Sequence, residues 1–294
     1  MSTDPGKLAL VDLGALAKPV TTLIEKVSDA VGGLAKPFQI RRVAQAEGDA
    51  EVMRARTRIE VMDIEERALN RFVFEEAKKQ ANIEAITAKA LPEVTDDANP
   101  EQMEDDWITN FFDKCRLISD EEMQTLWARI LAGEANVPGT FSRKIVDIVG
   151  SLDKKDAELF RSLCGYAFNI DGRAVPLIYD LNTSIYEQNS IDLETVSHLS
   201  SLGLVHVGGL TGYVLPGFPQ QRHVYYYGQP VWIGFDKPGP HEFRLGNVLL
   251  SQAGKQLVPI CGSRAVAGFI DYVREIWRSF GYRTDPEVAQ APSA

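Results

Sequence analysis

The hydrophobic pattern is clearest over residues 118–163, where it predicts a series of short helices. Ser119 and Glu122 have the spacing of a capping box at the start of the first helix, and Gly133 is suited to end it. Between them, apolar residues recur every three or four positions, which marks one face of a helix. The residues on this face are Met123, Leu126, Trp127, Ile130 and Leu131.

Two shorter helices are predicted next, with Ser142 and Asp153 as caps. Their predicted inward residues are Ile145, Ile148 and Val149 in the first helix and Leu159, Phe160 and Leu163 in the second. Helices this short are not stable alone in water, so they must pack on one another or on a neighbour. Trp127 is interpreted as a core residue of this pack, which contains no recognisable catalytic motif.

An amphipathic helical segment is predicted over residues 1–40. Pro19 suits a first helical turn, and Gly32 suits the end of the helix. One interpretation is that the apolar face packs on the rest of the protein or on a second copy. The other is that it lies on a membrane surface, since basic residues follow. The candidate interaction residues on this face are Leu16, Val20, Leu23, Val27 and Val31.

Residues 41–92 are rich in Ala, Glu and Arg and contain no proline before Pro92, which favours a long charged helix or a helix pair. Its apolar residues form a seam without a visible heptad: Ile59, Met62, Leu69, Phe72 and Val73. A stalk or oligomerisation arm is the favoured interpretation. A nucleic-acid-binding stripe is disfavoured because acids are interspersed with the arginines.

Residues 93–106 carry seven acidic and no basic side chains. Their spacing does not match a calcium-binding loop, so a solvated acidic linker is predicted instead of a metal site. Residues 107–168 are expected to form a helical domain that includes a helix over 153–168. Its first helix would bury Trp107, Ile108, Phe111, Phe112 and Cys115.

The pattern changes over residues 169–282, where an α+β, winged-helix-like domain is predicted. A helix at 192–202, capped by Asp192 and ended by Gly203, is followed by short strands and a helix after Ser251. The strands are expected at 204–207, 213–215, 224–235 and 243–250. An amphipathic helix at 264–280 and a flexible tail at 283–294 complete the chain. The fold class is therefore mainly α in the N-terminal two-thirds, with a smaller α+β C-terminal region.

Two sets of residues in this region are candidates for a site. Tyr225, Tyr227 and Trp232 could form an aromatic platform for a ligand or peptide, although alternation along a strand would bury one side anyway. The four histidines have no motif spacing, but folding could bring them near acids: His198, His206, His223 and His241, with Asp180, Asp236 and Glu242. No nucleotide-binding loop, hydrolase elbow or metal motif occurs, so no cofactor and no metal are predicted.

Composition narrows the function classes further. The formal net charge of −10 over 294 residues makes nucleic acid an unexpected partner, as does a predicted second helix without Arg or Lys. The three cysteines are odd in number and widely spaced, which suggests neither a disulfide framework nor a zinc site. No secretory signal and no membrane-spanning run is evident. A cytoplasmic location is expected, with peripheral contact to the inner membrane as the variant that the first helix allows.

The segment around Trp127 also carries a family resemblance. Residues 127–134 (WARILAGE), then 138–142 (PGTFS) and 152–160 (LDKKDAELF), resemble the signature of the DUF2806 family of uncharacterised bacterial proteins. The resemblance extends over most of the chain from about Lys18. The same helix is more weakly similar to the alpha class of abortive-infection proteins. The first resemblance implies no assigned reaction, and the second implies a role in defence against phage.

Two hypotheses of function follow. The first is a non-enzymatic bacterial interaction or assembly protein, of the phage-defence kind, that forms a homo-oligomer or binds a protein partner and contacts a membrane peripherally. The second is a hydrolase or nucleotide-responsive enzyme with its site in the C-terminal α+β domain. Deleting residues 1–40 should abolish the first function, and substituting single histidines should abolish the second.

Overall fold

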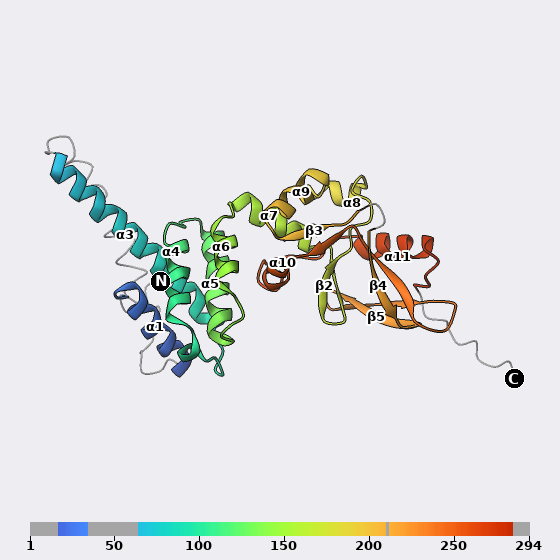
Figure 1. Cartoon of the computed structure of the whole chain (residues 1–294), viewed down its shortest axis with the longest axis horizontal. Coiled ribbons are helices and arrows are strands. Elements are labelled where there is room, and N and C mark those ends of the chain that lie inside the picture. Colours follow the sequence, from blue (N-terminus) through green and yellow to red (C-terminus); the bar gives the residue numbers. More distant parts are fainter. Residues whose placement is uncertain (1–16, 35–63, 210–211, 285–294) are drawn as a thin grey trace, which may run out of the picture. The chain divides into compact units, whose positions relative to one another are not determined.

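The computed structural model describes residues 17–34, 64–209 and 212–284, and its contacts divide the chain into two units (Figure 1). Unit 1 is Met1–Ser151 and unit 2 is Leu152–Ala294. This boundary falls inside the predicted 107–168 domain, because the helix after Asp153 packs with the sheet-containing unit. Each unit is described by itself below.

Unit 1 is helical in its described residues, and its core is aromatic. Within it α3 packs on α5, while α4 packs on both α1 and α6. Trp107 stacks on Phe111, and Phe111 meets the edge of Trp127, with ring centroids 5.1 and 5.2 Å apart. The helices are α1 (Lys18–Val31), α3 (Ile64–Ala90), α4 (Asp105–Cys115), α5 (Glu121–Asn136) and α6 (Arg143–Gly150), with short 3-10 turns η2 (Leu91–Glu93) and η3 (Pro100–Gln102).

The apolar face of α1 is covered inside unit 1. Val20, Leu23 and Val27 are buried, and the helix contacts α4 and η3. The Lys26 ammonium donates to the Met103 carbonyl at 2.8 Å and pairs with Asp105 at 2.9 Å. Among the other candidate interaction residues of this helix, Val31 is half-buried and Leu16 lies outside the described residues.

Helix α5 begins and ends later than its sequence pattern predicted. Its cap is Asp120, whose carboxylate accepts from the Glu122 and Met123 N–H groups, so the capping box predicted from Ser119 was wrong. Gly133 does not end the helix, which continues to Asn136. A side chain at Gly133 would lie 2.7 Å from the Phe141 ring, so close packing explains this glycine.

The segment after α3 is more folded than an acidic linker. Pro100 and Met103 are buried, and Glu93 pairs with Arg129 of α5 at 3.4 Å. The carboxylates lie mostly on the exposed side, where water solvates them, while the few apolar residues of the segment face the core. Because of this amphipathic arrangement, residues 93–106 pack along the surface of unit 1 with their apolar side chains inward.

Unit 2 combines helices with small antiparallel sheets. The sheets have strand orders β2-β1-β5-β6, β3-β8 and β4-β7. The strands are β1 (Ala167–Ile170), β2 (Arg173–Pro176), β3 (Val205–Val207), β4 (Tyr213–Phe218), β5 (Gln221–Tyr226), β6 (Gln229–Gly234), β7 (His241–Gly246) and β8 (Val248–Leu250). The helices are α7 (Lys154–Cys164), α8 (Ser184–Glu187), α9 (Leu193–Ser201), α10 (Gln252–Leu257) and α11 (Phe269–Ser279).

Several elements of unit 2 differ from their predictions. The strand expected over 243–250 is two strands, β7 and β8, which pair with β4 and β3, and the helix expected over 264–280 is Phe269–Ser279. Arg283, expected in the flexible tail, exchanges backbone hydrogen bonds with Gly234 at 2.8 and 2.9 Å.

The helix expected over 153–168 ends at Cys164, and the rest of that stretch forms β1. The single strand expected over 224–235 is a hairpin, β5 and β6, that turns at Tyr227 and Gly228. Both turn residues have positive φ, +47° and +84°. A tyrosine rarely adopts that conformation, so its side-chain contacts must stabilise the turn.

The core of unit 2 is also aromatic. Phe168 of β1 stacks on Tyr226 of β5 and meets the edges of Phe269 and Trp277 of α11. Edge and stacked contacts of this kind add to the free energy of burial, by about 0.5–1.5 kcal/mol per pair. They fix α11 against the sheet. None of the described helices is long and apolar enough to cross a membrane.

The packing of α1 gives a testable prediction. Leu23 is fully buried between α1 and its neighbours, so Leu23→Ala should lower the free energy of unfolding by about 2–4 kcal/mol in chemical denaturation. Val31→Ala, at a half-buried position of the same helix, is the control and should cost less than about 1.5 kcal/mol. Equal stabilities of Leu23→Ala and the unchanged chain would show that α1 does not pack on unit 1.

Candidate functional site

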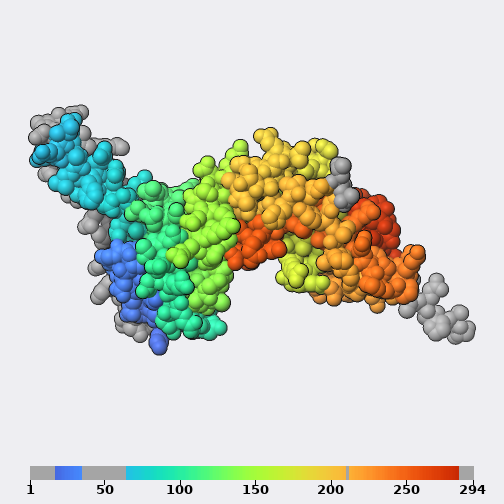
Figure 2. Space-filling model, in the orientation of Figure 1, coloured from blue at the N-terminus to red at the C-terminus, as the bar shows by residue number. Residues whose placement is uncertain are grey.

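Among the described helices of unit 1, the first half of α3 carries the most exposed large apolar side chains. Every residue over 64–78 except Asn70 is exposed, whereas burial begins at Asn82. Leu69, Phe72 and Val73 have 63%, 60% and 51% of their surface exposed. In Figure 2 this half of α3, in cyan, extends beyond the green atoms of α4 and α5. Clustered exposed apolar residues of this size indicate an interaction surface.

The exposed apolar residues and the buried residues of α3 lie on one helix face. Positions alternating by four and three run along that face: Glu65, Leu69, Phe72, Glu76, Lys79, Ile83, Ile86 and Ala90. The spacing is that of a heptad, but Glu65, Glu76 and Lys79 occupy three of these eight positions, so a sustained apolar heptad is still not present. The last three of the eight positions are buried, and α3 packs there on α5. We call residues 65–79 of this face the open seam.

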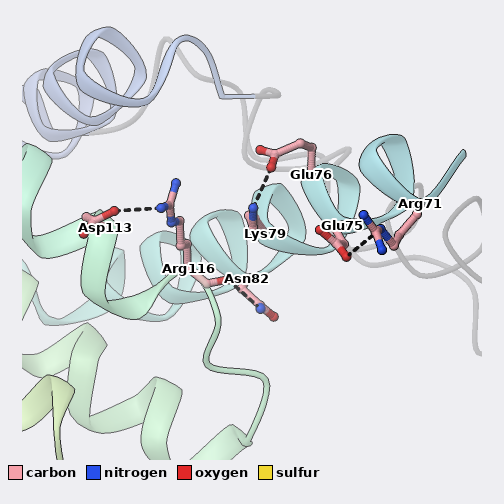
Figure 3. A network of polar contacts seen from close by, with 7 residues as sticks. All are labelled: Arg71, Glu75, Glu76, Lys79, Asn82, Asp113 and Arg116. Carbon is pink, nitrogen blue, oxygen red and sulfur yellow. Dashed lines mark hydrogen bonds and ion pairs between the residues drawn. The ribbon is translucent and has the colours of Figure 1, made fainter. Parts of the chain in front are cut away.

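Charged groups mark the place where the covered face gives way to the open seam (Figure 3). Lys79 pairs with Glu76 at 2.6 Å, both on the seam, and Arg71 pairs with Glu75 at 3.7 Å beside it. One turn further on, the Asn82 amide donates to the Arg116 carbonyl at 2.9 Å, which ties α3 to the end of α4. Exposed pairs of this kind contribute about 0–1 kcal/mol each. These ion pairs leave the apolar side chains of the open seam exposed.

The aromatic residues predicted in unit 2 are brought together only in part. Tyr225 and Tyr227 line a cavity of about 520 Å³ together with Cys164 and Ser263. Trp232 does not line it. Its ring lies under the Arg283 guanidinium, 5.6 Å from the ring centroid, and it faces His223 across the β5–β6 hairpin.

Sequence reasoning missed the interaction between Cys164, which lines this cavity, and Cys261. Cys164 and Cys261 are far apart in the chain, and no spacing motif joins them. A hydrogen bond from the Cys164 thiol lowers the pKa of Cys261 to about 7, whereas burial raises the pKa of Cys164. The Tyr227 hydroxyl forms hydrogen bonds with the Cys164 carbonyl at 3.2 Å and with the Ser263 hydroxyl at 2.7 Å. These bonds link the β5–β6 turn to the two segments that carry the thiols. The lowered pKa increases the thiolate fraction of Cys261 near neutral pH, while the thiol form donates to the Val258 carbonyl at 3.3 Å.

The histidines have separate partners. His198 of α9 bonds Asp156 of α7 at 2.6 Å, and His241 stacks on Phe235 with ring centroids 4.1 Å apart. Burial alone would raise the pKa of Asp156, but the bonds from His198 and from the Asp153 N–H outweigh it and lower that pKa. His206 and His223 are exposed. Within the described residues no group of three His, Cys, Asp or Glu side chains is placed to hold a metal ion.

A comparison with protein families identifies the chain. A family model described as "Protein of unknown function (DUF2806)" matches residues 66–274. The chain belongs to the DUF2806 family. The match begins in α3, one residue after the open seam starts, and ends in α11, so α1 lies outside it. Neither the curated proteins nor the solved structures contain a match.

The thiol pair of this DUF2806 protein predicts a pH-dependent reactivity. An aromatic disulfide reagent should modify Cys261 at a rate that is half-maximal near pH 7 instead of near its usual value of 9.0, because the thiolate is the reacting form. Cys115 and Cys164 are buried and should stay unmodified until the protein unfolds.

Two variants serve as controls for this measurement. Cys164→Ala removes the hydrogen bond to Cys261 and should move the half-maximal pH upward, while Cys164→Ser, which keeps a donor, should move it less. An unchanged profile in Cys164→Ala would contradict the assigned cause.

Proposed function

We propose that this protein is a non-enzymatic assembly protein that self-associates through the open seam of α3. The observation that supports the proposal is one helix face that is a core element over Ile83–Ala90 and exposes Leu69 and Phe72 over the preceding turns. We expect an apolar helix face with this pattern to pack against a partner along its whole length.

Helix stability supports the proposal as well. An isolated helix of about 12–15 residues is marginal in water, because its stability comes mainly from packing of an amphipathic face. Residues 64–78 form about four turns with no buried residue among them. A partner helix on the open seam would supply the missing packing and bury the Leu69 and Phe72 side chains, each contributing about 1.5–3 kcal/mol when fully buried.

A second copy of the chain is the partner that the charges favour. The exposed stretch has acids at its beginning, Glu65 and Glu66, and lysines at its end, Lys78 and Lys79. When this stretch is set against a reversed copy with Phe72 at the centre, Glu65 faces Lys79 and Glu66 faces Lys78, while Arg67, Arg71, Glu75 and Glu76 face uncharged residues. A different protein would need basic residues opposite Glu65 and Glu66 and acidic residues opposite Lys78 and Lys79.

The place of this assembly in the cell is a further part of the proposal. The similarity of residues 127–134 to alpha-class abortive-infection proteins supports a role in phage defence. Peripheral membrane contact through α1 has less support, since Val20, Leu23 and Val27 would have to leave unit 1 to meet lipid. Unit 2, as a winged-helix-like contact module without a basic second helix, suits a protein partner better than DNA.

A second candidate function has one observation in its favour. Cys164 lines a cavity with Tyr227 and Ser263, and Cys261, whose pKa is lowered by a hydrogen bond from Cys164, lies next to the lining residue Gly262 in the chain. A thiolate beside a cavity is an arrangement that acyl-transfer hydrolases use. The described histidines do not support it, because His198 bonds Asp156 instead of a thiol.

The open seam gives a direct test. Light scattering of the full-length chain should give twice the chain mass, and the double variant Leu69→Ser/Phe72→Ser should give the mass of a monomer, because two buried apolar contacts per helix are lost. Phe74 is 40% exposed but lies on the opposite side of the helix, so Phe74→Ser is the matched control and should remain a dimer.

The outcomes separate the two functions. A monomeric mass for the unchanged chain, or a dimer that the double variant leaves intact, would exclude assembly through this surface. The same variants address defence: in bacteria carrying the gene, phage plaque counts should rise in Leu69→Ser/Phe72→Ser but not in Cys261→Ser. The reverse result would favour the thiol-based function.

A further inference from the structure

The C-terminal limit of the exposed part of α3 restricts how two copies can meet. Exposure gives way to partial burial at Lys79 and Gln80, before the core begins at Asn82. Phe72 lies on the open seam about two helical turns before Gln80, and it is 60% exposed.

We infer that two α3 helices pair antiparallel about a two-fold axis at Phe72, with Glu65 and Glu66 of each copy facing Lys79 and Lys78 of the other. This inference rests on the proposed self-association and adds its direction and register. An isologous contact of this kind is the commonest arrangement in homodimers, because one patch serves both copies.

The apolar contacts agree with this register. With the axis at Phe72, the two Phe72 rings meet at the centre, and Leu69 of each copy lies between Phe72 and Glu76 of the other. Leu69 and Phe72 are at least half exposed in the single chain. The apolar centre is thus the Phe72 pair with the two Leu69 side chains, and Glu76 of each copy bounds it on either side.

The charges distinguish antiparallel from parallel pairing. In a parallel pair in register, Glu65 would face Glu65 and Lys79 would face Lys79, and like charges at close range are unfavourable. In the antiparallel pair each of these residues faces an opposite charge. Lys79 already pairs with Glu76 in its own helix, so the incoming Glu65 would complete a three-membered charge network.

The covered part of α3 limits the register in one direction. Pairing about Phe72 sets Ile64 of one copy beside Gln80 of the other, where unit 1 begins to cover α3. A register shifted by one turn toward the C-terminus would bring the partner helix against the buried part of the face, which α5 already occupies. The register at Phe72 therefore keeps the partner off the covered part of the face.

Cysteine cross-linking tests direction and register together. Glu65→Cys and Lys79→Cys are prepared separately in a Cys261→Ser background, mixed, oxidised mildly and digested, and the linked peptides are identified by mass spectrometry. The expected product of the mixture is a 65–79 link between copies, with at least tenfold less of the 65–65 and 79–79 links.

The outcomes also separate this inference from the proposed function. A dimer whose predominant links are 65–65 and 79–79 would overturn the antiparallel register and leave self-association standing. A monomeric mass with no link between copies would overturn both, and would mean that the face is covered from within one chain or by another protein.

Charge reversal provides a second test that does not depend on oxidation. The variant Glu65→Lys/Glu66→Lys and the variant Lys78→Glu/Lys79→Glu should each dimerise roughly tenfold or more weakly than the unchanged chain, because four facing pairs become repulsive. An equimolar mixture of the two variants should recover the original affinity. Circular dichroism of each variant checks that the helix persists.

In a parallel pair these variants would behave differently. Like charges would face each other in the unchanged chain and in each variant alike, so each variant would associate as well as the unchanged chain. That result would overturn the inference.

Discussion

The structure of unit 1 depends on one face of α3, which is buried against α5 along its second half and exposed along its first half. Ile83 and Ile86 of α3 are buried, and α5 lies against them, itself carrying Trp127 into the aromatic core. Because the same face continues through Phe72 without a change of spacing, α3 cannot rotate to hide its exposed apolar residues without withdrawing its buried ones. The exposed apolar surface is therefore a consequence of the core packing and cannot be removed by a small adjustment of the helix.

The sequence predicted the elements whose signals are local. Apolar periodicity located α1, α5 and α9, and the Asp192 cap with Gly203 at the far end of α9 is as predicted. The pattern could not predict features that depend on contacts with residues distant in the sequence. Gly133 reads as a helix end, but the Phe141 ring, which folds back over α5, makes it a packing position. The buried Glu134 carboxylate then accepts the Gly139 and Phe141 N–H groups and fixes that return of the chain.

The candidate sites were predictable to different degrees, for the same reason. Phe72 and Leu69 were recognised as a seam without a sustained apolar heptad, because Glu65, Glu76 and Lys79 occupy three positions of the same face. Only the three-dimensional arrangement shows that Glu76 and Lys79 separate a covered half from an open half. The pairing of Cys164 with Cys261 had no sequence signal, since it is made where the end of α7 meets the chain after α10.

The charged interruption of the seam explains why α3 would form a specific pair instead of a general apolar contact. An uninterrupted apolar heptad over residues 65–90 would bind many helices in several registers, and a register slip of one heptad would cost little. With Glu76 and Lys79 on the seam, a slip of that size removes Glu65 from its facing lysine and leaves charge against Phe72. Charged residues at these two positions stabilise a helix pair less than apolar residues would. They also restrict the partners of Phe72 to a helix that presents opposite charges at the same spacing, which a reversed copy of α3 does.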